Sequence, residues 1–138
     1  MNVVTKDASE VSTDGVVFVV DDEPLVADIV HFALAKHGFK AYKFYDPLSA
    51  LAFADTNIPS VLLSDFRMPV MNGLTLAGHI RERNPECKIV IMSGYVHEAS
   101  NHPQRGICEL VSKPVSISKL LAKVANALQS SMRSNSIC

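Results

Sequence analysis

The strongest constraint on the fold is a recurring run of apolar, strand-forming residues that ends at a polar or turn residue. Val16–Val20 reads Val-Val-Phe-Val-Val and is followed by two acids, and Val61–Asp65 ends in a single carboxylate. A third run, Lys88–Met92, is followed by Ser93. Runs that lack polar alternation are typical of strands buried on both faces, as in parallel sheets covered by helices.

Helical segments separate these runs. Asp22 is a plausible N-cap for a first helix, with Pro24 in its first turn and Gly38 after its end. The apolar residues that recur at helical spacing in this segment are Leu25, Ile29, Ala33 and Leu34. Further helices are expected at 47–54, at 73–83 and after Pro114, where the last one carries apolar residues from Ile117 to Leu128; further strands are expected at 39–44 and 108–112. The alternation of strand and helix predicts a parallel sheet.

The composition favours one ordinary globular domain. The chain has 138 residues, of which 48% are hydrophobic and 20% charged, and a formal net charge of -1. This balance does not favour nucleic-acid binding, and the lack of a signal-like or membrane-spanning run predicts a cytoplasmic protein without membrane insertion. We expect a domain at 15–129 between flexible tails at 1–14 and 130–138. The three cysteines are expected to be reduced.

The polar residues at the strand ends suggest one shared site. The carboxyl ends of parallel strands meet at one edge of a sheet, where ligands bind. Asp21 and Asp22 follow the first strand, Asp65 ends the third, Ser93 follows the fourth and Lys113 follows the fifth. Converging carboxylates repel each other unless a cation joins them, and oxygen ligands suit Mg²⁺. A carboxylate nucleophile beside a metal, an ammonium and a hydroxyl indicates phosphoryl transfer to Asp65.

These residues also carry a family resemblance. The order Asp21-Asp22, Asp65 followed by Met68-Pro69 and Asn72-Gly73, Ser93-Gly94 and Lys113-Pro114 resembles the receiver domain of two-component response regulators, over residues 16 to about 129. The resemblance implies a stand-alone, chemotaxis-type receiver with a flavodoxin-like α/β fold. Its five-stranded parallel sheet would have the order 2-1-3-4-5, with five helices on both faces.

The resemblance also implies a role for each matching residue. Asp65 would be the phosphoacceptor and a Mg²⁺ ligand, Asp22 a direct ligand, Asp21 a ligand through water, and the Arg67 backbone carbonyl a further ligand. Lys113 and Ser93 would assist the reaction, and the peptide bond before Pro114 would be cis. The donor would be a phosphohistidine of a histidine kinase or of a histidine phosphotransfer protein. The chain would be a phosphorelay regulator rather than an enzyme, and a monomer or weak dimer that binds an unknown downstream protein.

Two features depart from the family pattern. Leu110 stands where receivers usually carry an aromatic residue that reports phosphorylation, and the segment between Ser93 and Lys113 is short. Because Pro103 and Gly106 interrupt that segment, we expect only a short or frayed fourth helix there, and we expect the signal to be read through it. Arg67 and Tyr95 are expected to modulate the lifetime of the acyl phosphate.

Each residue also has a plainer interpretation. Asp21 and Asp22 could cap a helix, Asp65 could be a turn residue, Ser93 could be a cap, and Lys113 could be a solvated charge. A phosphorylation-independent adaptor is one alternative function, and an aspartyl-phosphate phosphatase is another. The phosphatase would favour a general acid two positions after Asp65, where this chain has Arg67. The five histidines lack paired ligand spacing, so no histidine metal site is predicted.

Overall fold

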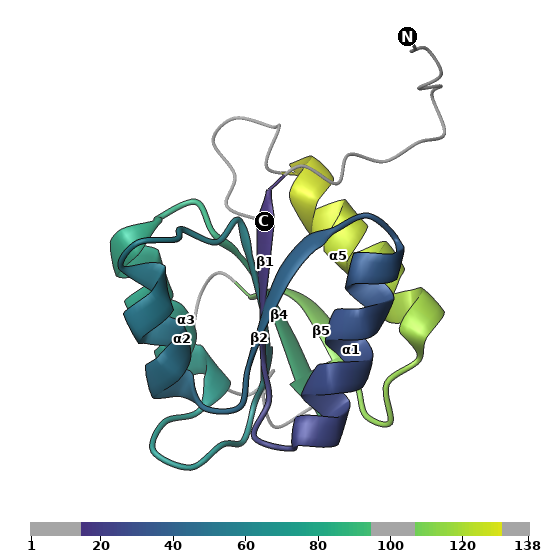
Figure 1. The fold of residues 1–138 in the computed structure, drawn as a ribbon, viewed down its shortest axis with the longest axis horizontal. Helices are drawn as coiled ribbons and strands as arrows, with labels where there is room; N and C mark the ends of the chain where they lie inside the picture. Colours follow the sequence, from purple (N-terminus) through teal and green to yellow (C-terminus); the bar gives the residue numbers. More distant parts are fainter. Residues whose placement is uncertain (1–14, 95–106, 131–138) are drawn as a thin grey trace, which may run out of the picture.

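A computed structural model describes residues 15–94 and 107–130, and these residues form a five-stranded parallel sheet (Figure 1). The strand order is β2-β1-β3-β4-β5, which confirms the predicted topology. The strand bounds are β1 Val16–Val20, β2 Lys40–Phe44, β3 Val61–Asp65, β4 Lys88–Ser93 and β5 Ile107–Ser112.

Helices cover both faces of this sheet. Their bounds are α1 Pro24–Lys36, α2 Pro47–Ala54, α3 Gly73–Arg83 and α5 Ile117–Ser130. Helices α1 and α5 lie on one face and α2 and α3 on the other (Figure 1). The expected fourth helix falls between 95 and 106, outside the described residues, as do the two expected tails apart from Ser130, which ends α5.

The helix starts follow local capping rules, with one correction. Asp46 caps α2 by accepting a hydrogen bond from the Ser49 N–H at 2.8 Å. The Asn72 side chain caps α3 by accepting one from the Thr75 N–H. The prediction of Asp22 as the cap of α1 is wrong. Pro24 takes the first helical position, so the cap falls on Glu23, whose side chain makes no capping hydrogen bond.

Two apolar layers hold the helices against the sheet. Alternate residues of β1 point to opposite faces, so Val17 and Val19 pack under α1 and α5 while Phe18 and Val20 pack under α2 and α3. Every residue of β3 and β4 is buried. Full burial of a valine, leucine or isoleucine side chain contributes roughly 1.5–3 kcal/mol to the stability of the fold, which explains why apolar runs become the central strands.

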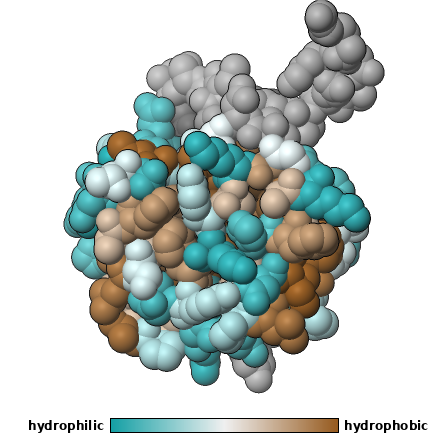
Figure 2. All heavy atoms as spheres, viewed as in Figure 1, coloured by the Kyte–Doolittle hydropathy of each residue, from teal (hydrophilic) through white to brown (hydrophobic). Residues whose placement is uncertain are grey.

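The predicted apolar stripe of α1 divides between the core and the surface. Ala33 and Leu34 are buried, but Leu25 and Ile29 are exposed, with Leu25 70% exposed. The core face is completed by Ala27 and Val30. Figure 2 shows apolar residues gathered over α1 at the lower right of the view.

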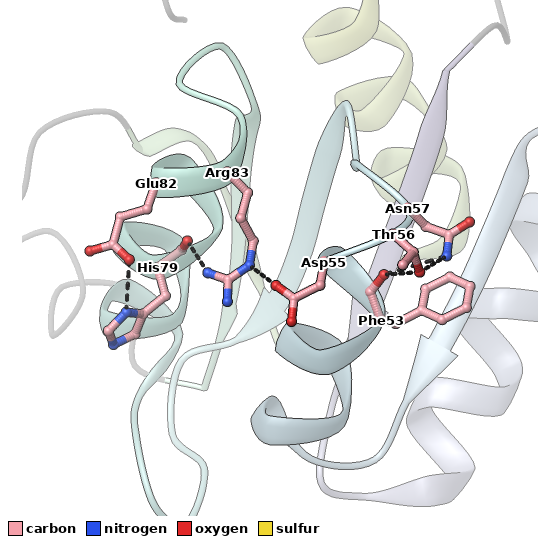
Figure 3. A network of polar contacts seen from close by, with 7 residues as sticks. All are labelled: Phe53, Asp55, Thr56, Asn57, His79, Glu82 and Arg83. Carbon is pink, nitrogen blue, oxygen red and sulfur yellow. Dashed lines mark hydrogen bonds and ion pairs between the residues drawn. The ribbon is translucent and has the colours of Figure 1, made fainter.

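A polar network joins the ends of α2 and α3 (Figure 3). Arg83 donates from Nε to Asp55 Oδ1 at 2.9 Å and from Nη1 to the His79 carbonyl at 2.9 Å. Asp55 is well exposed, so this ion pair contributes at most about 1 kcal/mol. Its contribution is mainly to orient two helices that already share an apolar layer.

No helix within 15–94 and 107–130 is long and apolar enough to cross a membrane.

Candidate functional site

Parallel pairing brings the predicted polar residues to one edge of the sheet. Val20 pairs with Ser64 and Asp65 pairs with Met92, so Asp21 and Asp65 follow neighbouring strands at the same level. Ser93 pairs with Ser112, the residue before Lys113, and the Lys113 N–H donates to the Ser93 carbonyl at 2.9 Å. The structure therefore places all the predicted strand-end groups on one side of the molecule.

Three carboxylates gather at this edge. Asp21, Asp22 and Asp65 each offer an oxygen within 4.8 Å of the other two. Asp21 is fully buried and Asp65 nearly so, whereas Asp22 is exposed. Such oxygen donors, two of them in a dry environment and one open to water, fit a small hard cation that keeps several of its waters.

Lys113 faces the same carboxylates. Its Nζ lies 3.1 Å from Asp21 Oδ2 and 3.1 Å from Asp65 Oδ1. It also lies 3.4 Å from Oε1 of Glu23. The peptide bond between Lys113 and Pro114 is cis, as the family resemblance implied.

The electrostatics of the site follow from burial and from this crowding. The pKa of Asp65 is raised from 3.8 to about 6, because burial and the charge of Asp21 raise it by more than Lys113 lowers it. Burial likewise raises the pKa of Asp21, against the Glu23 N–H and Lys113. For Lys113, burial acts to lower the pKa, but Asp21 and Asp65 together outweigh it, so the pKa is raised. The two buried acids are thus destabilised as anions and would gain from a bound cation.

The loop after β3 fixes the position of Asp65. The Phe66 N–H donates to the Met92 carbonyl at 2.8 Å, and the Gly73 N–H donates to the Phe66 carbonyl at 2.8 Å. A Cβ at Gly73 would collide with the carbonyl oxygen of Asp65, so only glycine allows this close approach of the backbone. Val70 adopts a φ of 79°, an unfavourable conformation for a β-branched residue.

The other predicted residues have the following positions. Ser93 is buried at the end of β4, and Arg67 is exposed in the loop after Asp65. Leu110 is half-buried in β5 and packs against the apolar layer under α2 and α3. Tyr95, with the segment expected to carry the signal, lies outside the described residues. His31 and His79 are partly buried helix residues.

Sequence reasoning did not assign Glu23 to the site. The sequence does contain an indication that Glu23 has another role, because glutamate is not a preferred N-cap residue and here stands directly before a helix-starting proline. A groove of about 510 Å³ beside the site was also not predicted. It is lined by Glu23, Val26, Ile29, Val30, Lys113, Pro114, Val115 and Ile117.

The described fold and edge site define a receiver-type α/β domain, with acids and a lysine at the carboxyl ends of parallel strands. The family model of the response regulator receiver domain matches residues 17–125. The chain therefore belongs to this family.

Two curated transcriptional regulators are similar to this chain over most of its length. The DNA-binding transcriptional regulator NtrC of Salmonella typhimurium is 34% identical over 116 residues, which are 83% of this chain and 25% of that protein. The probable transcriptional regulatory protein TcrX of Mycobacterium tuberculosis is 30% identical over 82% of this chain and 49% of its own. The chain thus spans a quarter to a half of the length of these curated relatives.

Solved structures show the same fold. NtrX from Brucella abortus superposes with a TM-score of 0.78 at 28% identity, over 86% of this chain and 27% of that chain. Response regulator TrrA from Thermotoga maritima, solved in complex with Mg²⁺ and BeF, gives a TM-score of 0.71 at 28% identity, over 80% of this chain and 96% of that chain.

Proposed function

We propose that Asp65 accepts a phosphoryl group from a phosphohistidine of a histidine kinase or of a histidine phosphotransfer protein. The observation that carries this proposal is the position of the Asp65 carboxylate, nearly buried among other acids and 3.1 Å from the Lys113 ammonium. A buried, crowded carboxylate with a raised pKa is costly for stability and needs a functional reason.

The proposal includes Mg²⁺, which the donor set fits. Asp21, Asp22 and Asp65 would hold the ion, and the family resemblance adds the Arg67 backbone carbonyl. When bound, Mg²⁺ neutralises negative charge around a transferring phosphoryl group. The similar TrrA structure was solved in complex with Mg²⁺ and BeF, which supports an ion of this kind in the proposal.

The residues of the chain divide the transfer step between them. A carboxylate oxygen of Asp65 forms the new O–P bond while the bond from phosphorus to the imidazole nitrogen of the donor breaks, and that nitrogen keeps the electron pair. Lys113 donates hydrogen bonds to the phosphoryl oxygens, and Ser93 adds a hydroxyl at the neighbouring strand end. No group of the chain needs to give or take a proton during this step.

The output is binding of a downstream protein or onward transfer of the phosphoryl group, rather than turnover of a small substrate. Leu110 packs as an aliphatic residue against the layer under α2 and α3, so readout need not depend on an aromatic side chain. Arg67 is exposed two positions after Asp65, where its side chain can limit the access of water to the acyl phosphate. We extend the same role to Tyr95.

Intact-mass measurement after incubation with acetyl phosphate and Mg²⁺ tests the function. The parent should gain the mass of one phosphoryl group, and Asp65→Asn should gain none. Asp55→Asn is a matched control, because it also removes a carboxylate but one that pairs with Arg83 away from the site. No mass gain on the parent would contradict the proposal and favour the adaptor, and release of inorganic phosphate with continuous turnover would favour the phosphatase.

A further inference from the structure

Glu23 stands at a helix start without acting as a cap. It is the N-cap residue of α1, yet its side chain makes no hydrogen bond to the N–H groups of the first turn. The Glu23 carboxylate instead lies 3.4 Å from Lys113 Nζ, a residue 90 positions later. A residue type that is poor for its local position and contacts a site lysine suggests a role in the site.

The hydrogen-bond capacity of Lys113 limits what it can hold. A lysine ammonium has three N–H donors. Three carboxylates, from Asp21, Asp65 and Glu23, lie within 3.1, 3.1 and 3.4 Å of it, so each donor already has a carboxylate partner. The donor that now contacts Asp65 can pass to its phosphoryl group, but Lys113 can give that group a second donor only if it releases Asp21 or Glu23.

Glu23 is the partner that can leave at the lowest cost. Asp21 is fully buried, so losing the ammonium would leave a charge unpaired in a dry environment. Phosphorylation of Asp65 replaces one carboxylate oxygen near Lys113 with three charged phosphoryl oxygens, so Lys113 stays engaged on that side of the site. The Glu23 side chain is 66% exposed, so water can replace Lys113, and its contact is the longest of the three.

We infer that Glu23 is a positioning residue that holds Lys113 before phosphorylation and releases it when a phosphoryl group arrives on Asp65. This inference rests on the proposed function. Glu23 thereby competes with the phosphoryl group for one lysine donor and weakens the phosphorylated state. Asp21, Asp22 and Asp65 form the acidic cluster, so Glu23 acts on the lysine side of the site rather than on the side expected to hold the metal.

Glu23→Gln tests the competition, since it removes the charge and keeps the size of the side chain. With saturating Mg²⁺, NMR titration with beryllium fluoride, a phosphoryl mimic, should show binding roughly two- to fivefold tighter than in the parent, as expected for loss of an exposed ion pair. Titration with Mg²⁺ alone should give affinity equal to or weaker than the parent. A general structural defect would weaken both ligands, so the split between them separates the two explanations.

Two further variants control the result. Asp28→Asn removes a carboxylate from the same helix that pairs with Lys43 at 2.9 Å, and it should leave both affinities unchanged. Glu23→Ser removes the carboxylate and supplies a preferred N-cap residue, so it should match the tighter beryllium fluoride binding of Glu23→Gln with no loss of folding stability.

The outcomes distinguish this inference from the proposed function. If the parent neither binds beryllium fluoride nor gains phosphoryl mass, both are wrong. If the parent binds beryllium fluoride and gains phosphoryl mass, but the two Glu23 variants bind beryllium fluoride no more tightly than the parent, only the inferred role of Glu23 is wrong. An equal gain in Asp28→Asn would also overturn it, because the effect would then be long-range charge rather than competition for Lys113.

Discussion

Replacing Asp65 with asparagine should stabilise the chain when no divalent cation is present. The variant keeps the size of the side chain but removes a carboxylate that lies among Asp21, Asp22 and Lys113. The gain arises because burial and the charge of Asp21 both disfavour the ionised form of Asp65, and the attraction of Lys113 does not offset them.

The magnitude follows from the pKa of Asp65. Because the pKa rises from 3.8 to about 6, ionising this group costs about 3 kcal/mol more in the folded chain than in the unfolded chain. The side chain is only 11% exposed, so solvent screening reduces this cost little. Asparagine avoids the cost, and we expect the free energy of unfolding at about pH 7.5 to rise by about 2–3 kcal/mol.

The pH dependence has a definite sign. A folded-state pKa above the unfolded value means that the stabilising contribution belongs to the protonated form. That contribution is complete below 3.8 and is lost as the pH rises to about 6. Asparagine does not titrate, so its advantage over the parent should shrink to about 1 kcal/mol at about pH 4.5.

Urea unfolding in EDTA at both pH values measures this difference. Added Mg²⁺ should raise the stability of the parent more than that of Asp65→Asn, because one ligand is missing from the variant. Asp55→Asn serves as the control and should be no more stable than the parent, since it removes an exposed ion pair with Arg83. An Asp65→Asn variant that is no more stable than the parent in EDTA at the higher pH would refute the reasoning.

Three other changes test the local structure by urea unfolding. Asp46→Ala removes the cap on the Ser49 N–H and should lower the free energy of unfolding by about 1 kcal/mol near neutral pH. Because that hydrogen bond lowers the pKa of Asp46, the loss should shrink as the pH falls through this pKa. An equal loss at all pH values would contradict this explanation. Gly73→Ala places a Cβ against the Asp65 carbonyl, so it should lower the free energy of unfolding by about 1–3 kcal/mol and slow phosphorylation by acetyl phosphate. A variant as stable as the parent would show that the loop backbone can shift without cost. Val70→Asn replaces a β-branched residue at positive φ and should raise the free energy of unfolding by about 1 kcal/mol. A lower free energy of unfolding would show that packing of the valine, which is 77% exposed, outweighs the backbone strain.

The sequence by itself determined the architecture and the strand-end residues that gather at one edge of the sheet. Continuous apolar runs such as Val61–Leu63 have no polar face to expose, so they must become central strands. Parallel pairing then forces the residues at their carboxyl ends, Asp65 and Lys113 among them, to one edge. These are local or topological consequences of residue type, and they need no knowledge of side-chain positions.

The tertiary structure decided which groups touch and which faces are open. The cap of α1 moved from Asp22 to Glu23, and the apolar spacing of α1 did not reveal that Leu25 would be exposed. The contact between Glu23 and Lys113 joins residues 90 positions apart. Its existence depends on the packing of α1 beside α5 and on the rotamers of side chains within a crowded charge cluster. Such interactions are decided by competition among many neighbours in space, and a linear pattern does not encode that competition.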